Sequence, residues 1–354
     1  MNLSLIRFLC LIFALGNILT TASSEEKQLQ LDTLEDEINY LTPSKSINLD
    51  SRLSTYVDSN DRYGVRQSYV SISGEIEDQI RAVITLNIGH LFSSGELAPN
   101  NDFSLSQFVR EAYIEIRNYK GKPYAFVVGK RPITFGLNLE QMPFFERNPL
   151  YREMFLQDVY GFTVELTEGL LGALDNLEFT VYERKRNDLL IEEVGNYAFR
   201  GQKYISKQAL LNIGYSNEST NDEDVRKKRF NVGIVGTSKD GKILAWLEGI
   251  MFNDRKSIEE YTLGVNAGIT YLVTKNTKLI VESNIIQNTL YQIGLGAKVN
   301  LTKNIALGLE ARFTLLPSNT FETFYGLNLT HLIDTELYRT NANEPTIFED
   351  DYEL

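Results

Sequence analysis

Few residues in this chain have the type and spacing of a catalytic group. The sequence contains only two histidines, His90 and His331. Ser93, Ser94 and Asp102 follow His90, and serine, histidine and aspartate are the residue types that a serine hydrolase combines. Serine and aspartate are also common turn residues, because their side chains bond to nearby backbone groups. The two histidines are expected at opposite ends of the fold, so the sequence predicts no enzyme.

Other catalytic and ligand-binding patterns are also missing. The many carboxylates show no spacing that indicates the paired acids of a glycosidase. Gly294 and Gly296 lie in an alternating segment that no helix follows, so they do not form a phosphate-binding loop. No cluster of metal ligands is visible, and we expect no cofactor.

A second group of candidates is a set of charged residues on the polar face of alternating segments. Fixed charges on one face attract or repel ions and charged solutes. Lys130 and Arg131 are further candidates, but "YAFVVG" before them is apolar at every position, which leaves their direction open. The main set has seven acids and five bases: Arg81, Glu111, Glu115, Arg117, Glu165, Glu178, Arg184, Glu248, Glu282, Lys298, Glu310 and Arg312.

The elements that hold these charges are predicted to be strands. In "YTLGVNAGITYLV", residues 261–273, Leu263 and Val265 share one face and Asn266 lies on the other. Such period-two alternation gives a strand one apolar and one polar face. The segments are about ten residues long, which is the length of a tilted strand that crosses a membrane. A soluble β-sandwich, with shorter strands, is the alternative.

Fifteen such segments can be placed from residue 47 onward, and a single-chain bacterial barrel should have an even number of strands. The alternation of short and long connections is broken between residues 187 and 227. We therefore expect a sixteenth strand in "LLIEEVGNYAF", whereas fourteen strands would result if one segment lies in a loop. The fifteen segments are 47–57, 64–74, 78–89, 107–118, 122–134, 158–167, 176–186, 206–216, 228–238, 242–253, 260–273, 277–286, 289–301, 304–315 and 321–332.

The aromatic residues and the connections also favour a membrane barrel. Tyrosine and phenylalanine recur near segment ends, as in the aromatic girdles at the two membrane interfaces. Short connections such as "SKDGK" alternate with long polar ones such as 90–107, 137–158 and 187–203. The aromatic set is Tyr56, Tyr69, Tyr160, Tyr215, Phe252, Tyr261, Tyr271, Tyr291 and Phe324.

The two ends of the chain are expected to lie outside the barrel, which we place at 47–334. Residues 1–22 have the order of a secretory signal peptide, with Arg7 before a short apolar run. The pattern of residues 23–46 predicts an acidic, helix-like leader, and residues 335–354 are predicted to form an acidic tail. Cys10 lies in the apolar run, so the mature chain has no cysteine. The net charge of -12 argues against nucleic-acid binding, which needs a basic surface.

One hairpin resembles a known family. In "VREAYIEIRNYKGKPYAFVVGKRPITFG", the triplet Glu111–Tyr113 and the later pattern from Val128 to Gly136 resemble the phosphate-selective porin O and P type. The resemblance covers under a tenth of the chain. It implies a sixteen-stranded outer-membrane channel, a homotrimer and a pore lined with basic residues. The acidic tail lacks the terminal aromatic residue that is usual in that family.

The sequence thus predicts an outer-membrane porin that passes small hydrophilic solutes or ions through a water-filled lumen. A phosphate filter needs an excess of arginine and lysine, and the charged set has more acids than bases. We expect a weakly cation-preferring or poorly selective pore, unless these charges pair across strands and only stiffen the barrel. The alternative is a structural or adhesion barrel, plugged by the leader or by residues 137–158.

Overall fold

The computed structural model describes the chain from residue 44 to residue 341, with gaps. The gaps are residues 60–62, 66–67, 78, 89–107, 119–122, 138, 140, 145–147, 157–158, 171–173, 185–194, 220–225 and 254–260. The predicted signal peptide, nearly all of the leader, most of the acidic tail and His90 lie outside the described residues.

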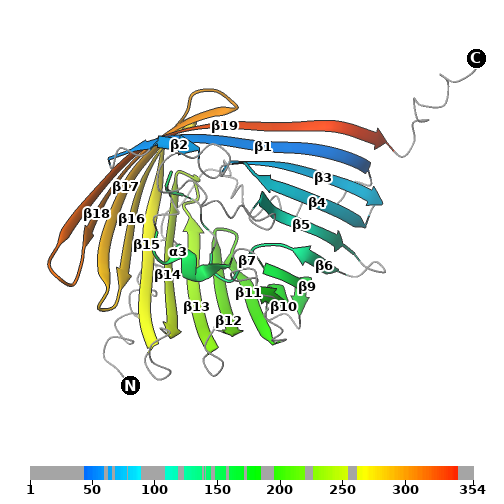
Figure 1. Cartoon of the computed structure of the whole chain (residues 1–354), viewed down its shortest axis with the longest axis horizontal. Coiled ribbons are helices and arrows are strands. Elements are labelled where there is room, and N and C mark those ends of the chain that lie inside the picture. Colours follow the sequence, from blue (N-terminus) through cyan, green and yellow to red (C-terminus); the bar gives the residue numbers. More distant parts are fainter. Residues whose placement is uncertain are drawn as a thin grey trace, which may run out of the picture.

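Sixteen long strands form one closed antiparallel barrel, as the sequence predicted (Figure 1). They run from Ser44 to Asn341, slightly beyond the range 47–334 that we expected. The strands are β1 (Ser44–Asp58), β3 (Tyr69–Glu77), β4 (Ile80–Asn87), β5 (Val109–Ile116), β6 (Tyr124–Lys130), β9 (Val159–Leu170), β10 (Leu174–Arg184), β11 (Asn196–Ser206), β12 (Ala209–Ser219), β13 (Arg226–Thr237), β14 (Ile243–Asn253), β15 (Tyr261–Thr274), β16 (Thr277–Ile286), β17 (Leu290–Asn300), β18 (Ile305–Leu315) and β19 (Phe321–Asn341).

The first and last strands close the barrel. β1 pairs with β19 from Ser44 opposite Asn341 to Asp58 opposite Gly326, which leaves no open edge. Three further short strands and one short helix complete the described elements: β2 (Tyr63–Val65), β7 (Ile133–Thr134), β8 (Phe155–Leu156) and α3 (Tyr151–Met154).

The sixteenth strand is β11, and the sequence located it only in part. Its residues Asn196–Ser206 include just the end of "LLIEEVGNYAF". Gly201 and Lys203 occupy the face opposite to Arg200 and Gln202, where apolar residues are expected, which makes its alternation weak. The region 187–227 therefore contained the missing strand, but centred later than we expected.

The barrel is apolar outside and polar inside. In β16 the side chains of Leu279 and Val281 are 47% and 50% exposed, whereas Glu282 and Asn284 are 4% and 0% exposed. The same alternation recurs around the sheet, with exposed leucine and isoleucine beside buried asparagine and glutamate. This is the inverse of a water-soluble protein and fits a wall with lipid outside.

The two ends of the barrel differ, and we name them by their connections. The short-turn end carries the turns 207–208, 238–242, 275–276 and 301–304, and the long-loop end carries connections such as 185–195 and 254–260. Exposed Tyr261, Tyr291 and Phe321 begin strands at the long-loop end, whereas Tyr204 and Tyr271 lie near the short-turn end. These are two aromatic girdles. Of the predicted aromatic set, Tyr56 and Phe252 are instead buried.

Within the part of the chain that the structure describes, no helix has both the length and the apolar character to span a membrane.

Candidate functional site

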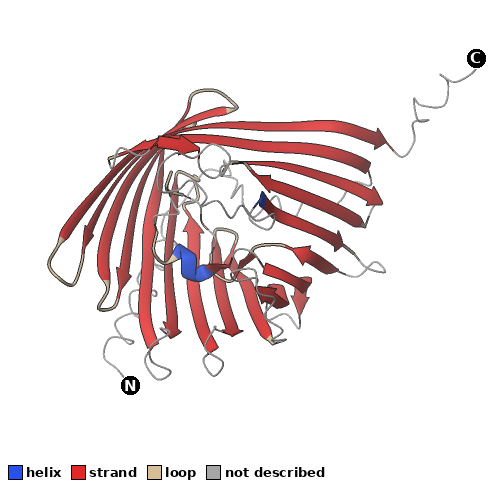
Figure 2. Cartoon of the chain, in the orientation of Figure 1, coloured by secondary structure: helices blue, strands red, loops and turns tan. Residues whose placement is uncertain are grey.

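The connection between β6 and β9 folds into the barrel. We call residues 131–158 the inward segment; it contains β7, α3 and β8, and Figure 2 shows α3 within the ring of strands. Its side chains Phe135, Leu150 and Leu156 are 0% exposed and form an apolar cluster with wall residues such as Ile250. A second cluster joins Leu137 of the segment to Val235 of the wall. The segment is therefore packed against the wall, and we take it with the charged inner wall as the candidate site.

Glycines on the inner face make room for the inward segment. A Cβ atom built on Gly214 would lie 1.9 Å from the Phe135 carbonyl oxygen, and one on Gly264 would lie 2.3 Å from Leu150 Cδ2. Any side chain at these positions would displace the segment. The remaining contacts join Gly233 to Leu137, Gly294 and Gly296 to Met142, Gly308 to Pro143, and Gly326 to Phe144.

Three glutamates of the predicted set bind the inward segment. All three are at most 4% exposed and accept hydrogen bonds from the segment, so burial is balanced by polar contacts. Their carboxyl oxygens are directed at the segment. The bonds join Leu137 N to Glu248 Oε1 (2.7 Å), Phe144 N to Glu310 Oε2 (2.5 Å) and Asn148 Nδ2 to Glu282 Oε1 (2.8 Å).

Buried amide side chains connect these glutamates to other polar residues of the wall in two chains of hydrogen bonds. Networks of this kind are stable only when nearly every member has a partner. The two chains together extend from β11 to β18 and give the inward segment a rigid base. The bonds run from Arg200 through Asn212 and Asn231 to Glu248, and from Trp246 through Asn266, Asn284 and Gln292 to Arg312.

The returning part of the inward segment is held by ion pairs. Glu153 of α3 lies 2.5 Å from Lys227 Nζ and 3.1 Å from Arg229 Nε. Arg229 also bonds to Glu218 at 2.9 Å. Burial alone would raise the pKa of Glu153, but the charges of Lys227 and Arg229 outweigh it and hold the pKa of Glu153 below its usual value.

Three candidate charges and Arg200, which the sequence analysis did not single out, meet on the wall formed by β9, β10 and β11. Arg131 lies 2.6 Å from Glu165 and 3.7 Å from Glu178, and Arg200 lies 3.9 Å from Glu178. Glu165 and Glu178 are directly opposite each other in the sheet, where two like charges repel. Arg131, at the start of the inward segment, lies between these two carboxylates, and Arg200 supplies the second positive charge.

A second ion pair lies on β5, next to the first group. Arg117 bonds to Glu115 at 2.7 Å and approaches Glu75 at 3.8 Å. Arg81 and Glu111 are half-buried on the same inner face. Several of the predicted residues therefore form close pairs of opposite charge. Such pairs are what we expected if the charges stiffen the barrel.

The Lys130 side chain does not lie beside that of Arg131. Its side chain is 2% exposed, its ammonium donates to the Val109 carbonyl at 2.5 Å, and it lies 5.5 Å from the centre of the Tyr160 ring. Gly129 has a φ of 132°, a conformation that favours glycine, and β6 keeps its register with β5 and β9 through Gly129 and Lys130. Lys130 and Arg131 therefore lie on opposite faces of the sheet. Because "YAFVVG" is apolar on both faces, the sequence could not reveal which of the two faces inward.

Three candidates remain, namely Arg312, Lys298 and Arg184. Arg312 is buried and bonds to Glu310 and Gln292 beneath the inward segment. Lys298 lines a small cavity of about 50 Å³ together with Arg52. The Arg184 side chain lies outside the described part of the structure.

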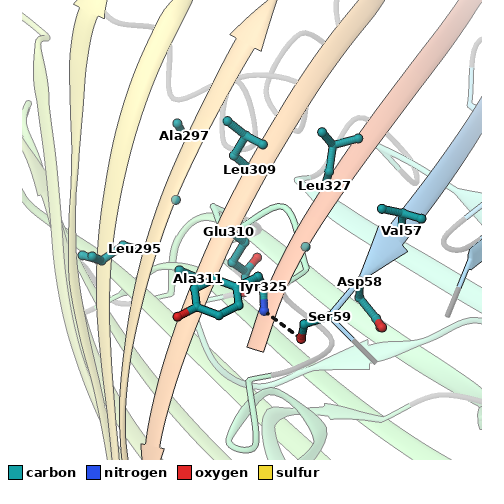
Figure 3. A pocket seen from close by; sticks show the side chains of 12 residues that line it. Val57, Asp58, Ser59, Leu295, Ala297, Leu309, Glu310, Ala311, Tyr325 and Leu327 are labelled. Carbon is teal, nitrogen blue, oxygen red and sulfur yellow. Dashed lines mark hydrogen bonds between the residues drawn. The ribbon is translucent and has the colours of Figure 1, made fainter. Parts of the chain in front are cut away.

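The outer wall also carries a hollow, with a volume of about 580 Å³ (Figure 3). It lies over Ala297 and Ala311, between the exposed side chains of Leu295, Leu309 and Leu327. A binding site for a polar solute needs converging polar groups. This apolar hollow on the outside of the barrel does not qualify.

The described residues do not bring together side chains that could form a catalytic or metal site. His331 lies on β19 near the short-turn end, and its pairing partner in β1 is Leu53. Among the side chains that the structure describes, no group of three or more histidine, cysteine, aspartate and glutamate residues could hold a metal ion.

Comparisons with known proteins place the fold. No family model and no curated protein match the chain. Solved structures that cover 82% of it include a Salmonella typhi OmpF complex with daunomycin, with 12% identity, 97% of that chain covered and a TM-score of 0.56. The chain has the fold of a porin. An anion-selective porin from Comamonas acidovorans (13% identity, 100% covered, TM-score 0.55) and a trimer form of the Vibrio cholerae outer membrane protein OmpT (11%, 99%, 0.55) are similarly close.

Proposed function

We propose that this chain is an outer-membrane porin, which lets small hydrophilic solutes or ions diffuse down their gradients. The observation that carries the proposal is the closed barrel whose buried inner face is polar and whose exposed outer face is apolar. A polar interior suits a water-filled passage, and an apolar exterior suits lipid. The porin fold, the apolar run after Arg7 and the aromatic girdles support export to the bacterial outer membrane.

The inward segment sets the width of the proposed passage. It contacts the wall from β10 to β19, so solutes would pass between it and the wall formed by β3 to β9. This wall carries Arg81, Glu111, Glu115, Arg117 and Glu165, and Arg131 at the start of the inward segment bonds to Glu165. We propose these six as pore-lining residues. The solved structures with this fold include porins and an outer membrane channel, which favours an open lumen over a plugged structural barrel.

We infer poor ion selectivity, with at most a slight preference for cations. The charges on this wall include close pairs of opposite sign, such as Arg117 with Glu115 and Arg131 with Glu165. Three further glutamates bond to the inward segment. A phosphate filter of the O and P type would need clustered cations, and Lys130 is turned away from Arg131. A homotrimer is the assembly we propose, because a trimer form is recorded for one protein of this fold.

Swelling of liposomes tests the proposed diffusion. Vesicles with the reconstituted full chain should swell in isosmotic solutions of small neutral sugars, at rates that fall as the sugar becomes larger. Vesicles without protein are the control. Equal swelling rates with and without correctly folded protein would refute an open lumen.

A further inference from the structure

Cations and tyrosines gather on the outer surface of the barrel at the long-loop end. Arg226 and Lys228 are the first two outward-facing residues of β13, and Phe230 on the same face is 42% exposed. In the register of the sheet, Lys228 lies beside Asn217 of β12, and Asn217 lies beside Tyr197 of β11. We call this group, with Tyr215, the rim patch: Tyr197, Tyr215, Asn217, Arg226 and Lys228.

Hydrogen bonds fix the geometry of the rim patch. Arg226 donates from Nε to Asn217 Oδ1 at 2.7 Å and from Nη2 to the Gly195 carbonyl. Asn217 in turn donates to the Tyr197 hydroxyl at 3.2 Å. These bonds use two of the five N–H donors of the guanidinium group. The Lys228 side chain is exposed. The patch therefore presents positive charge from a prearranged surface.

The depth of the rim patch matches that of a lipid headgroup. Just nearer the middle of the barrel, Phe230, Met251 and Leu263 are 40–43% exposed and provide an apolar surface. Tyr261 begins β15 at the level of the patch and is 47% exposed. Aromatic residues mark the boundary between hydrocarbon and headgroups. The two cations thus lie on the headgroup side of this boundary.

We propose that the rim patch binds the phosphate of a lipid headgroup in the outer leaflet. Long loops face the outside in barrels of this type, so the patch meets the outer leaflet. Guanidinium binds phosphate with two parallel N–H bonds, and lysine adds a point charge. The exposed apolar surface below the patch is placed to contact the acyl chains, which favours a lipid over free phosphate.

The competing outcome is pairing within the chain. The connection 220–225 carries Asp222, Glu223 and Asp224, which directly precede Arg226 in the sequence. If these acids neutralised the cations, the patch would not attract an anionic lipid. A variant in which these three acids are neutralised is therefore part of the test.

Native mass spectrometry of the full chain in detergent measures the binding of phosphatidic acid, with diacylglycerol of the same acyl chains as the phosphate-free comparison. We expect phosphatidic acid to bind and diacylglycerol not to bind. Each cation near an anionic headgroup strengthens binding about fivefold. Replacing both cations, by Arg226→Gln with Lys228→Gln, should therefore weaken binding about 25-fold.

A matched control removes two exposed lysines at the short-turn end, by Lys239→Gln with Lys242→Gln. This control should retain binding at the rim patch, and both double variants should retain the conductance of the unchanged protein. Equal affinity of the Arg226/Lys228 variant and the unchanged protein would overturn the proposal. Displacement of the lipid by millimolar inorganic phosphate would overturn the assignment to a lipid. Binding that appears only after neutralisation of Asp222, Glu223 and Asp224 would establish internal pairing instead.

Discussion

The Glu248 carboxylate and the Leu137 backbone N–H lie 2.7 Å apart, although 111 positions separate the two residues in the sequence. The same Glu248 oxygen accepts a bond from Asn231 at 2.8 Å. This contact joins the middle of the barrel wall to the inward segment. The polar inner wall thus holds the inward segment through side-chain hydrogen bonds, without adding it to the sheet as a further strand.

Replacement of Glu248 should separate the hydrogen bond from the charge. Glu248→Ala leaves the Leu137 N–H and the Asn231 amide unpaired in a buried site, which should cost about 1–3 kcal/mol. Glu248→Gln keeps an acceptor oxygen and should cost clearly less. Unfolding in urea, followed by circular dichroism, measures both variants. Equal losses for alanine and glutamine would contradict the hydrogen-bond role.

Glycine at position 214 should be required for the path of the inward segment. Gly214→Ala places a methyl group against the Phe135 carbonyl, and such overpacking costs about 1–3 kcal/mol. Gly74→Ala is the control, because its new Cβ would meet no atom closer than 3.8 Å. Its unfolding free energy should change by about 0.5 kcal/mol at most. A control as unstable as Gly214→Ala would refute the steric explanation.

Acid should loosen the returning part of the inward segment. Because its folded-state pKa is lowered, Glu153 stabilises the segment above its ordinary pKa of about 4.5, and this contribution is lost as the pH falls through the folded value. Current noise in single channels should therefore increase below about pH 4.5. In Glu153→Gln the noise should be high at neutral pH and change little on acidification. A pH response that Glu153→Gln leaves intact would contradict this account.

Arg131 should control the residual ion preference. Its removal in Arg131→Gln leaves Glu165 and Glu178 opposite each other without their closest shared cation. The reversal potential in a KCl gradient should then shift toward that of K⁺. Arg131→Lys keeps the charge and should shift it much less. Lys130→Gln should also have little effect, because the Lys130 side chain is buried beside Val109 and Tyr160.

Local patterns predicted most of the strands but little of the inward segment. The alternation in residues 260–273 predicted β15 almost to the residue, because one face meets lipid and the other does not. The weaker pattern around Gly201 and Lys203 obscured β11. The direction of Lys130 could not be predicted, because both faces of "YAFVVG" are apolar and either could have faced the lipid.

The position of the inward segment could not be read from its own residues, because its partners are far away in the sequence. Phe144 meets Glu310, 166 positions later. The available signal was on the wall, where glycines recur on the polar faces of β12, β13, β15, β17 and β18. We interpreted those glycines as part of a wet interior, and the structure shows that they also accommodate packed apolar side chains.

The most direct test of an open lumen is a current record from the purified full chain in a planar bilayer under a KCl gradient. We expect stable unitary steps, with a reversal potential close to zero or slightly toward that of K⁺. A reversal potential near that of Cl⁻ would contradict the proposed charge pairing but keep the pore. No steps from correctly folded protein would contradict the porin itself.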